Sequence, residues 1–484
     1  MYANEPPQRL KISDLLLLDA CAASGGPRTQ MSTVHLDRWK VVYEAIAEWY
    51  RSDDPDEAAV PAIVDRIMGW MDPVQRQIAE DLFATYRQLL PKRPDEEIDL
   101  DPPSSEVFDD DTNASLSVAT QFGVDSSTEL EVVKLKTGRG VSDEEKAVLV
   151  DGAEDPSVQF LEVRLQSGEV DELEMAPEVR RAIIERLFAI PGRVRQSGSA
   201  GTTPGLHCFT CSRPARCGQY PTLDGRQLGS GTRAVIVTKK WLARLQLCER
   251  QVAWARLYGI PHADSDEEEG WRLAAGNAFH DAAAAAQLAD DPERVIADFA
   301  DTLHGSERAD LLLLWERHTQ LVADEPYPVA VRDTDYGLGV TAVAPGLYID
   351  SNDQEHPQSP IGVVFIGFTD AVGNEPDGTP AVVEHRTGTY ASLPLEPELY
   401  ALGAHLLTGK TPVAVHTHQL RDPDGPTCHR VEFGETELGA ASDQLQAAAG
   451  KVAAWHPTDS LSAPYTVGDW CQWCPFEARC MTHR

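Results

Sequence analysis

The spacing of apolar positions predicts alternating helices and strands in the second half of the chain. From Thr238, apolar residues recur at helical spacing as far as Trp254, and Gly259 follows as a stop signal, which predicts one long helix. The Ala-rich residues 273–289 predict a second helix, and a more polar helical stretch follows to about Ala323. A helical segment of the chain is therefore expected before the first strands of this half.

Residues 361–388 contain two Val/Ile-rich runs joined by a loop rich in Gly, Pro and Asp, which is typical of a β-hairpin. The first predicted strand ends in Asp370, and the second ends in the triplet Glu384, His385 and Arg386. The later segments predict a helix at 396–409, strands at 411–420 and 428–435, and an Ala-rich helix at 435–455. This alternation of helices and strands predicts an α/β domain.

The first half of the chain repeats this order in a weaker form. Residues 116–138 predict another hairpin, which carries Asp125 and the triplet Lys134, Leu135 and Lys136, and both halves share the string VV-x-x-(K/R)-T-G. A chain of 484 residues is too long for one ordinary core and fits two domains. The repeat predicts their bounds as 1–230 and 231–484.

Eight of the nine cysteines form two sets of the same shape, each a single cysteine followed far downstream by a CxxCx5C triplet. Both triplets end in Ala-Arg-Cys, and both single cysteines lie in Leu-rich segments that are predicted to be helical. The first set is Cys21, Cys208, Cys211 and Cys217, and the second is Cys248, Cys471, Cys474 and Cys480.

Four thiolates are what a 4Fe-4S cluster requires, one for each iron, so we expect two such clusters. Zinc is the alternative, although a four-cysteine zinc ribbon usually brings two CxxC pairs. Disulfides are the weaker alternative, because no signal peptide or apolar span of transmembrane length is present and a cytoplasmic location is expected. Cys428 stands outside both sets and is expected to be a structural residue.

A formal net charge of −35 argues against a polyanionic partner, but the charge is unevenly distributed. Residues 179–256 hold fourteen Lys or Arg against three acidic residues, a net charge of +11. A basic surface between the halves that binds DNA is one interpretation of this segment, and an ordinary solvated stretch is the other. Acidic runs elsewhere are expected to be solvated linkers.

The hairpin of the second half brings two carboxylates and a cation toward one place. Mg²⁺ and Mn²⁺ prefer oxygen ligands, and Mn²⁺ also accepts a histidine, so Asp370, Glu384 and His280 are candidate ligands. His416 and His418 lie two apart on a predicted strand and share one face, which we expect to be solvated rather than a metal site.

Six motifs in order, Cys248, GNAFH, GFTD, VVEHRTG, ExxxY and the last triplet, resemble the RecB-type branch of the PD-(D/E)XK nucleases. The iron-sulfur members, the AddB-type helicase-nuclease subunits and the CRISPR-adaptation exonucleases, are the most similar. The resemblance implies two tandem restriction-endonuclease-like α/β domains, each with a mixed central sheet flanked by helices and joined by a four-cysteine cluster.

By that resemblance, His280, Asp370 and Glu384 bind the metal, Arg386 occupies the position of the catalytic lysine, and Glu396 with Tyr400 occupies the Gln-x-x-x-Tyr position. Arg for Lys and Glu for Gln are departures from the family pattern. Arginine keeps the positive charge but is a poor proton acceptor. Activity survives these replacements if the charge alone is needed and is lost if the lysine must give up a proton.

Lys134 stands where the first half should have a metal-binding carboxylate, so we interpret that half, with His35 and Asp125, as a degenerate copy. The preferred hypothesis is a metal-dependent nuclease that cleaves DNA ends or single strands, in repair, recombination or defence. The alternative is a catalytically inactive iron-sulfur subunit that binds DNA or serves as a scaffold. No Walker A motif is present, so any unwinding would come from a helicase or other protein partner, and no membrane association is expected.

Overall fold

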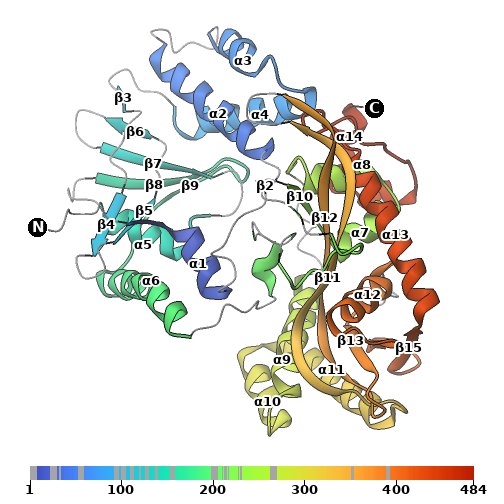
Figure 1. Cartoon of the computed structure of the whole chain (residues 1–484). Coiled ribbons are helices and arrows are strands. Elements are labelled where there is room, and N and C mark those ends of the chain that lie inside the picture. Colours follow the sequence, from blue (N-terminus) through green and yellow to red (C-terminus); the bar gives the residue numbers. More distant parts are fainter. Residues whose placement is uncertain are drawn as a thin grey trace, which may run out of the picture.

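The structure is a computed structural model (Figure 1). It describes residues 8–21, 30–31, 34–52, 59–91, 97–99, 105–109, 114–118, 122–125, 130–136, 140–152, 158–197, 205–209, 211, 215, 217–226, 228, 232–261, 270–349, 354–388 and 393–483. No helix within these ranges is both long enough and apolar enough to span a lipid bilayer.

A seven-stranded mixed sheet forms the centre of the second half. Its strand order is β15-β14-β13-β12-β10-β2, and β11 forms a long antiparallel ladder with β12. The neighbours β10 and β12 run parallel, as do β13 and β14, whereas β12–β13 and β14–β15 are antiparallel. The strands are β2 (Gln30–Met31), β10 (Arg233–Thr238), β11 (Ala330–Ile349), β12 (Glu355–Asn374), β13 (Pro380–Arg386), β14 (Val413–Gln419) and β15 (Thr427–Phe433).

Helices cover this sheet and supply its core. The helices α7 and α8, together with α12 and α13, contribute to one large apolar cluster with the strands, while α9, α10 and α11 form a second cluster beside it. Their bounds are α7 (Lys239–Leu245), α8 (Glu249–Arg256), α9 (Gly270–Gln287), α10 (Pro292–Thr302), α11 (Gly305–Asp324), α12 (Glu396–Thr408), α13 (Glu435–Ala453) and α14 (Glu477–Thr482), with 3-10 turns at Leu206–Phe209 and Asp469–Trp473.

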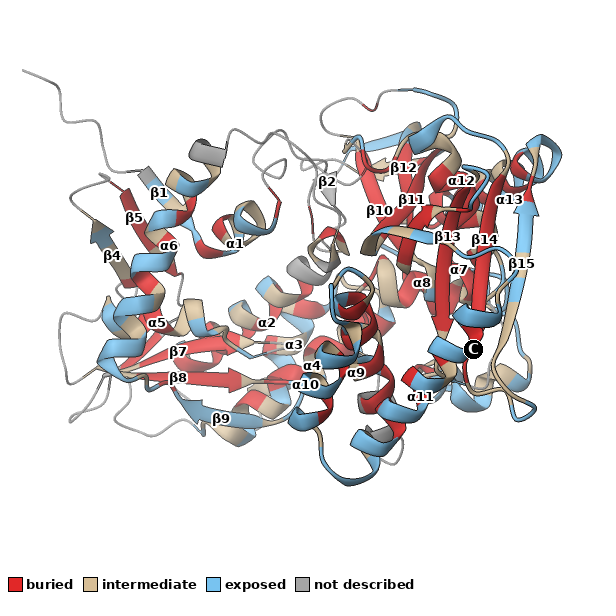
Figure 2. Cartoon of the chain, turned by 90° about the horizontal axis from the view of Figure 1, so that it is seen from below, coloured by how far each residue is buried: buried red, intermediate tan, exposed pale blue. Residues whose placement is uncertain are grey.

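The burial of the strands explains their composition. Residues 380–385 of β13 are buried in succession, because this strand lies inside the sheet and helices or side chains cover both of its faces. In contrast, β15 is an outer strand with several exposed residues (Figure 2). Because β13 is a buried inner strand, the side chains at its end are held in defined positions.

The predicted hairpin, the helix at 396–409, the two later strands and the last long helix are confirmed. Three expectations were wrong in detail. The single helix from Thr238 is two helices, separated near Cys248. The first strand of the hairpin does not end at Asp370, because β12 continues to Asn374. The long strand β11 was not anticipated, since its Gly-rich sequence has little regular alternation.

The first half contains two smaller sheets with the orders β3-β6-β7-β8-β9 and β1-β5-β4. Its strands are β1 (Gln8–Lys11), β3 (Glu97–Asp99), β4 (Ser105–Asp109), β5 (Ala114–Val118), β6 (Phe122–Asp125), β7 (Leu130–Lys136), β8 (Val158–Arg164) and β9 (Glu169–Glu172). Its helices are α1 (Ile12–Ala20), α2 (Val34–Arg51), α3 (Val60–Met68), α4 (Pro73–Leu89), α5 (Asp143–Asp151) and α6 (Pro177–Ser197).

Strand connections in the two halves follow the same pattern. The strands β6 and β7 are antiparallel, β7 and β8 are parallel with α5 between them, and β8 and β9 are antiparallel. The series β12 to β15, with α12 between β13 and β14, has the same directions. In addition, β1 leads into α1 and Cys21 as β10 leads into α7 and Cys248.

The register of the first hairpin corrects one prediction. Asp125 pairs with Leu130, four residues before Lys134, whereas Ala371 pairs with Val383, so Asp370 lies level with Glu384. Asp125 therefore does not occupy the position of Asp370. Of His35, the structure describes only its place at the start of α2 and not its side chain.

Segments of the first half also pack against the second half. Arg38 of α2 donates to the carbonyl of Gly259 at 2.8 Å, and the hydroxyl of Ser460 donates to Asp72, at the start of α4, at 2.5 Å. Gln219, just after the first cysteine triplet, donates to the carbonyl of Gly337 on β11 at 2.8 Å. The two halves of the sequence thus share an apolar core.

Candidate metal centre and cysteine sets

A cavity of about 610 Å³ lies where β10, β12 and β13 approach their carboxyl ends. Helix α9 and the first cysteine triplet also border it, since Phe209 lines the cavity and its ring lies 4.9 Å from that of Phe368. The charged residues and histidines that line it are Lys239, Lys240, His280, Asp335, Asp370, Glu384, His385 and Arg386. Most of the residues predicted for the metal centre therefore meet in one cavity.

Asp370 is the acceptor at one side of this centre. His280 Nδ1 lies 2.5 Å from Asp370 Oδ1, and the backbone N–H of His385 donates to Asp370 Oδ2 at 2.5 Å. Burial opposes ionisation of Asp370, but His280 and His385 outweigh it and hold the pKa of this carboxyl well below its usual range. Burial alone would lower the pKa of His280, and the Asp370 carboxylate raises it instead.

Glu384 is the second acid of the centre, and Lys239, which was not among the predicted site residues, contacts it. Lys239 Nζ donates to Glu384 Oε1 at 2.5 Å and to the carbonyl of Phe368 at 3.1 Å. Tyr400 is buried, and its hydroxyl lies 2.8 Å from Lys239 Nζ and 3.1 Å from Glu384 Oε2. Burial and the Glu384 carboxylate raise the pKa of Tyr400 well above its usual range.

Arg386 and Glu396, the two departures from the expected pattern, form an ion pair with each other. Arg386 Nη1 also lies 3.3 Å from Glu384 Oε1, and Lys239 Nζ lies 3.1 Å from Glu396 Oε1. Glu396 is only 1% exposed, so its charge requires these partners. The negative charge of Glu396, which stands at the expected Gln position, is thus balanced by the nearby Arg386.

The structure therefore brings His280 and Asp370 together on one side of the cavity, and Glu384 and Arg386 on the other. Tyr400 lies buried behind Glu384 and does not line the cavity. Lys239 was missed. The apolar run of β10 ends at Thr238, which pairs in parallel with Ile366, so Lys239 begins α7 close to Phe368 and Asp370. A lysine directly after a buried strand was the only signal in the sequence.

His416 and His418 are not solvated, contrary to expectation. They are 0% and 2% exposed, because α11 covers the face of β14 on which they lie. Their neighbours His385 and His318 are also buried, and burial lowers the pKa of His318 to about 4. A continuous group of histidine rings fills the space between these elements, with 5.4 Å between the rings of His385 and His418.

The residues of the centre fit a divalent metal ion. The ligand atoms of His280, Asp370 and His385 lie within 4.8 Å of one another, and Glu384 faces the same cavity. His280 contacts Asp370 and Lys239 contacts Glu384, so a nitrogen group already lies beside each carboxylate. Two carboxylates with one imidazole form a donor set suited to Mn²⁺, and the carboxylates alone suit Mg²⁺.

The second cysteine set converges on the end of the chain. Cys248 caps the N-terminus of α8, and Cys471, Cys474 and Cys480 lie on the final turns and α14. Burial raises the pKa of the Cys474 thiol, and the neighbouring Cys248 and Cys480 raise it further. Gln251 Nε2 donates to Cys474 Sγ at 3.1 Å. Cys248, near the start of the second half, therefore lies close to Cys474, near its end.

The first set converges in the same way. Cys21 directly follows α1. Burial raises the pKa of the Cys208 thiol, and the neighbouring Cys21 raises it further. Burial and the three triplet cysteines Cys208, Cys217 and Cys211 raise the pKa of Tyr220. Neither cysteine set is among the described groups whose ligand atoms all lie within 4.8 Å.

Fold and site together define a mixed α/β protein with an acidic, metal-compatible centre at the edge of its sheet. The family model of the PD-(D/E)XK nuclease superfamily matches residues 240–481, which is half of the chain. The protein therefore belongs to the PD-(D/E)XK nuclease superfamily. Nucleases of this superfamily use divalent metal ions.

Comparison with curated proteins gives no significant match. A solved structure titled "Crystal structure of SSO0001" is 14% identical over 51% of this chain and 86% of that chain, with a TM-score of 0.20. At that TM-score the likeness has no weight for the fold or the function.

The Arg386–Glu396 ion pair leads to a stability prediction. Arg386→Ala should lower the free energy of unfolding by about 3 kcal/mol, because it removes a partner from a buried carboxylate. The double variant Arg386→Met/Glu396→Met should lose less, since no unpaired charge remains. Denaturant titration followed by tryptophan fluorescence measures both.

Arg332→Ala, which breaks an exposed pair with Asp333, is the control and should cost less than about 0.5 kcal/mol. Equal losses in the single and double variants would contradict the prediction.

Proposed function

We propose that the protein is a metal-dependent nuclease of the RecB-type branch that cleaves DNA at ends or in single strands. The observation that carries this proposal is the convergence of four side chains on one cavity: His280, Asp370 and Glu384 from the matched family region, and Lys239 directly before it. The test is Mn²⁺-dependent cleavage of labelled single-stranded DNA by the wild type and by Asp370→Ala.

His280, Asp370 and Glu384 would bind the divalent ion, which supplies Lewis acidity toward a phosphodiester and lowers the pKa of water. The side chains of the protein do the remaining work. Lys239 and Arg386 bring positive charge to the cavity where a phosphate gains negative charge. Tyr400 fixes the orientation of the Glu384 carboxylate from within the core.

The DNA-end or single-strand preference rests on the order of motifs and on the local charge. Lys239 and Lys240 open α7 at the cavity and belong to the basic segment 179–256. Phosphate binding depends on such cations, even in a chain with a net charge of −35. A helicase or other protein partner that presents single strands belongs to the same proposal.

Two 4Fe-4S clusters, one in each cysteine set, form the second part of the proposal. A four-cysteine zinc ribbon usually brings two CxxC pairs, whereas each set here is one distant cysteine with a compact CxxCx5C triplet. This pattern favours iron over zinc, because a 4Fe-4S cluster requires one cysteine for each iron. The clusters would be structural, because each joins the beginning of one half to its end.

The matched strand directions support a tandem origin, with a degenerate first copy at 1–230 and the nuclease domain at 231–484. Lys134 lies on β7 as Glu384 lies on β13, and Lys134 is buried. A buried lysine at that place does not bind a divalent cation. The first copy would then contribute its cluster and its contacts, including Phe209 at the cavity, rather than a second active centre.

Metal content tests the cluster proposal. Anaerobically purified protein should contain about eight iron atoms per chain, since two four-cysteine sites each hold four irons. Cys471→Ser should remove about half of the iron and leave the first cluster in place. Elemental analysis with sulfide determination and the visible absorption spectrum provides the measurement. Zinc in both sets without iron would overturn this part of the proposal while leaving the nuclease assay to be decided separately.

A further inference from the structure

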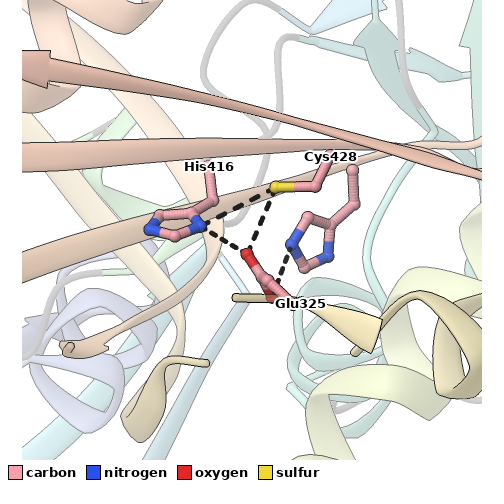
Figure 3. A group of neighbouring side chains, drawn as sticks. Glu325, His416 and Cys428 are labelled. Carbon is pink, nitrogen blue, oxygen red and sulfur yellow. Dashed lines mark hydrogen bonds and ion pairs between the residues drawn. The ribbon is translucent and has the colours of Figure 1, made fainter. Parts of the chain in front are cut away.

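A second group of metal-ligating side chains lies between β14, β15 and the end of α11, outside the cavity of the proposed nuclease centre. Its members are Glu325, His416, His418 and Cys428, and their ligand atoms all lie within 4.8 Å of one another. None of the four lines the cavity. Figure 3 shows the side chains of Glu325, His416 and Cys428 pointing toward one another.

The sheet positions three of these ligands. His416 and His418 lie two residues apart on β14 and therefore share a face. Cys428 on β15 pairs directly opposite His418, so its side chain lies on that face as well. Glu325, the residue at which α11 ends, supplies the fourth ligand from the covering helix.

The distances approach those of a tetrahedral site. Cys428 Sγ lies 3.2 Å from Glu325 Oε1 and 3.8 Å from His416 Nδ1, and His418 Nε2 lies 3.6 Å from Glu325 Oε2. Ligands on one zinc ion lie about 3.3 to 3.6 Å apart, given bond lengths of about 2.0 to 2.3 Å. Of these four separations, the 2.6 Å between His416 Nδ1 and Glu325 Oε1 departs most from that range and would have to lengthen.

The second nitrogen of His416 is already fixed. Its Nε2 lies 2.8 Å from Glu375, and Arg430 holds Glu375 with two contacts of 2.6 and 2.8 Å. With Nε2–H donating to Glu375, the lone pair of Nδ1 faces the Glu325 carboxylate. Two acceptors at that distance need a cation between them, either a proton or a metal ion. Metal-ligating histidines commonly donate their other ring N–H to a carboxylate, as His416 does to Glu375.

His418 provides an independent observation. It is 2% exposed, and among the described residues neither ring nitrogen has a hydrogen-bond partner within 3.5 Å, while Nε2 lies 3.6 Å from Glu325 Oε2. Buried polar side chains in folded proteins are normally hydrogen-bonded, because an unpaired buried donor or acceptor is costly. A metal ion at the group would bind Nε2, which faces Glu325.

We propose that Glu325, His416, His418 and Cys428 form a zinc site. One thiolate, two imidazoles and one carboxylate are borderline ligands that suit Zn²⁺, whereas Mg²⁺ and Ca²⁺ prefer oxygen. Four protein ligands close the coordination shell, so the site is structural. It ties the end of α11 to β14 and β15, and His418 lies beside His385, whose backbone N–H holds Asp370.

Zinc analysis of the full-length protein tests the site. Cys428→Ser and His416→Ala should each lose about one zinc per chain, because one ion needs all four ligands. Their iron content should not change. His429→Ala is the matched control, since His429 is exposed on β15 next to Cys428, and it should keep the zinc. X-ray absorption at the zinc edge of the wild type should show one sulfur and three nitrogen or oxygen ligands.

The outcomes separate the alternatives. Zinc bound by four sulfurs alone would place the metal in the cysteine sets and overturn the proposal. Absence of zinc, or zinc content unchanged in Cys428→Ser and His416→Ala, would do the same and leave a protonated His416 between two carboxylates. Loss of zinc in His318→Ala but not in Cys428→Ser would move the ion to the neighbouring group His318, His385 and His418. The absorption spectrum of the wild type decides the ligands even if a variant fails to fold.

Discussion

Asp370→Ala should abolish Mn²⁺-dependent cleavage of labelled single-stranded DNA, with a loss of about a thousandfold or more. His280 and the backbone N–H of His385 hold the pKa of this carboxyl well below its usual range. Losing a carboxylate ligand removes several kcal/mol of charge stabilisation, and each 1.36 kcal/mol corresponds to a factor of ten in rate. Gel separation of 5′-labelled products measures the rate at saturating Mn²⁺.

The control for this experiment is Asp377→Ala. Asp377 is an exposed acid in the turn of the same hairpin, where it accepts the N–H of Thr379 at 2.9 Å, so its loss should leave the rate within about twofold. Cleavage that Asp370→Ala leaves unchanged would reject the proposed centre. DNA binding by the wild type without any cleavage would favour the inactive scaffold, because the fold and the binding surface would then remain without the chemistry.

The elements of the second half could be predicted because local patterns agree with the tertiary structure. The strand Pro380–Arg386 is a buried apolar run with charged residues at its end, and the helix Glu396–Thr408 has few helix breakers. The long strand Ala330–Ile349 was missed, because it contains Asp, Gly and Pro, which are unfavourable in strands. Pairing with β12, a strand of equal length, stabilises it nevertheless. Its strand character comes from pairing with β12 and not from its own sequence.

Side-chain environments were harder to predict than elements. His416 and His418 alternate with threonine and valine, which is typical of a half-solvated strand, and only the packing of α11 buries them. Glu325 reaches them across 91 residues of sequence from His416. The same limit applies to Asp125, whose motif resembles GFTD but whose register places it level with Leu130. A one-dimensional pattern does not determine register or contacts between distant segments.

The pairing of Arg386 with Glu396 changes the interpretation of the two departures from the family pattern. A sequence comparison treats Arg for Lys and Glu for Gln as two separate losses. In the structure they form one ion pair, and an ammonium from another element contacts Glu384. Under the proposed function, the candidate for the lysine of the site is then Lys239, 147 residues before Arg386.

Lys239→Met should reduce the single-turnover cleavage rate by about a hundredfold, because it removes the ammonium nearest to Glu384 while keeping most of the side-chain volume. Lys240→Met is the matched control. Lys240 also lines the cavity, but its loss should weaken DNA binding more than the rate at saturating DNA. Thermal unfolding of both variants separates a loss of rate from a loss of folded protein.

Arg386→Met completes the comparison, because it removes the other cation from the cavity. If Lys239 supplies the charge for phosphate cleavage, Arg386→Met should retain more activity than Lys239→Met once folding is taken into account. The reverse order would assign the role to Arg386, as the position in the family pattern implies, and would make Lys239 a structural partner of Glu384 and Tyr400.

Lys239→Arg adds a second criterion, since an arginine at this place keeps the charge but cannot lose a proton. Partial activity in Lys239→Arg would mean that the site needs the charge itself, and complete loss would mean that it needs an amine that can release its proton.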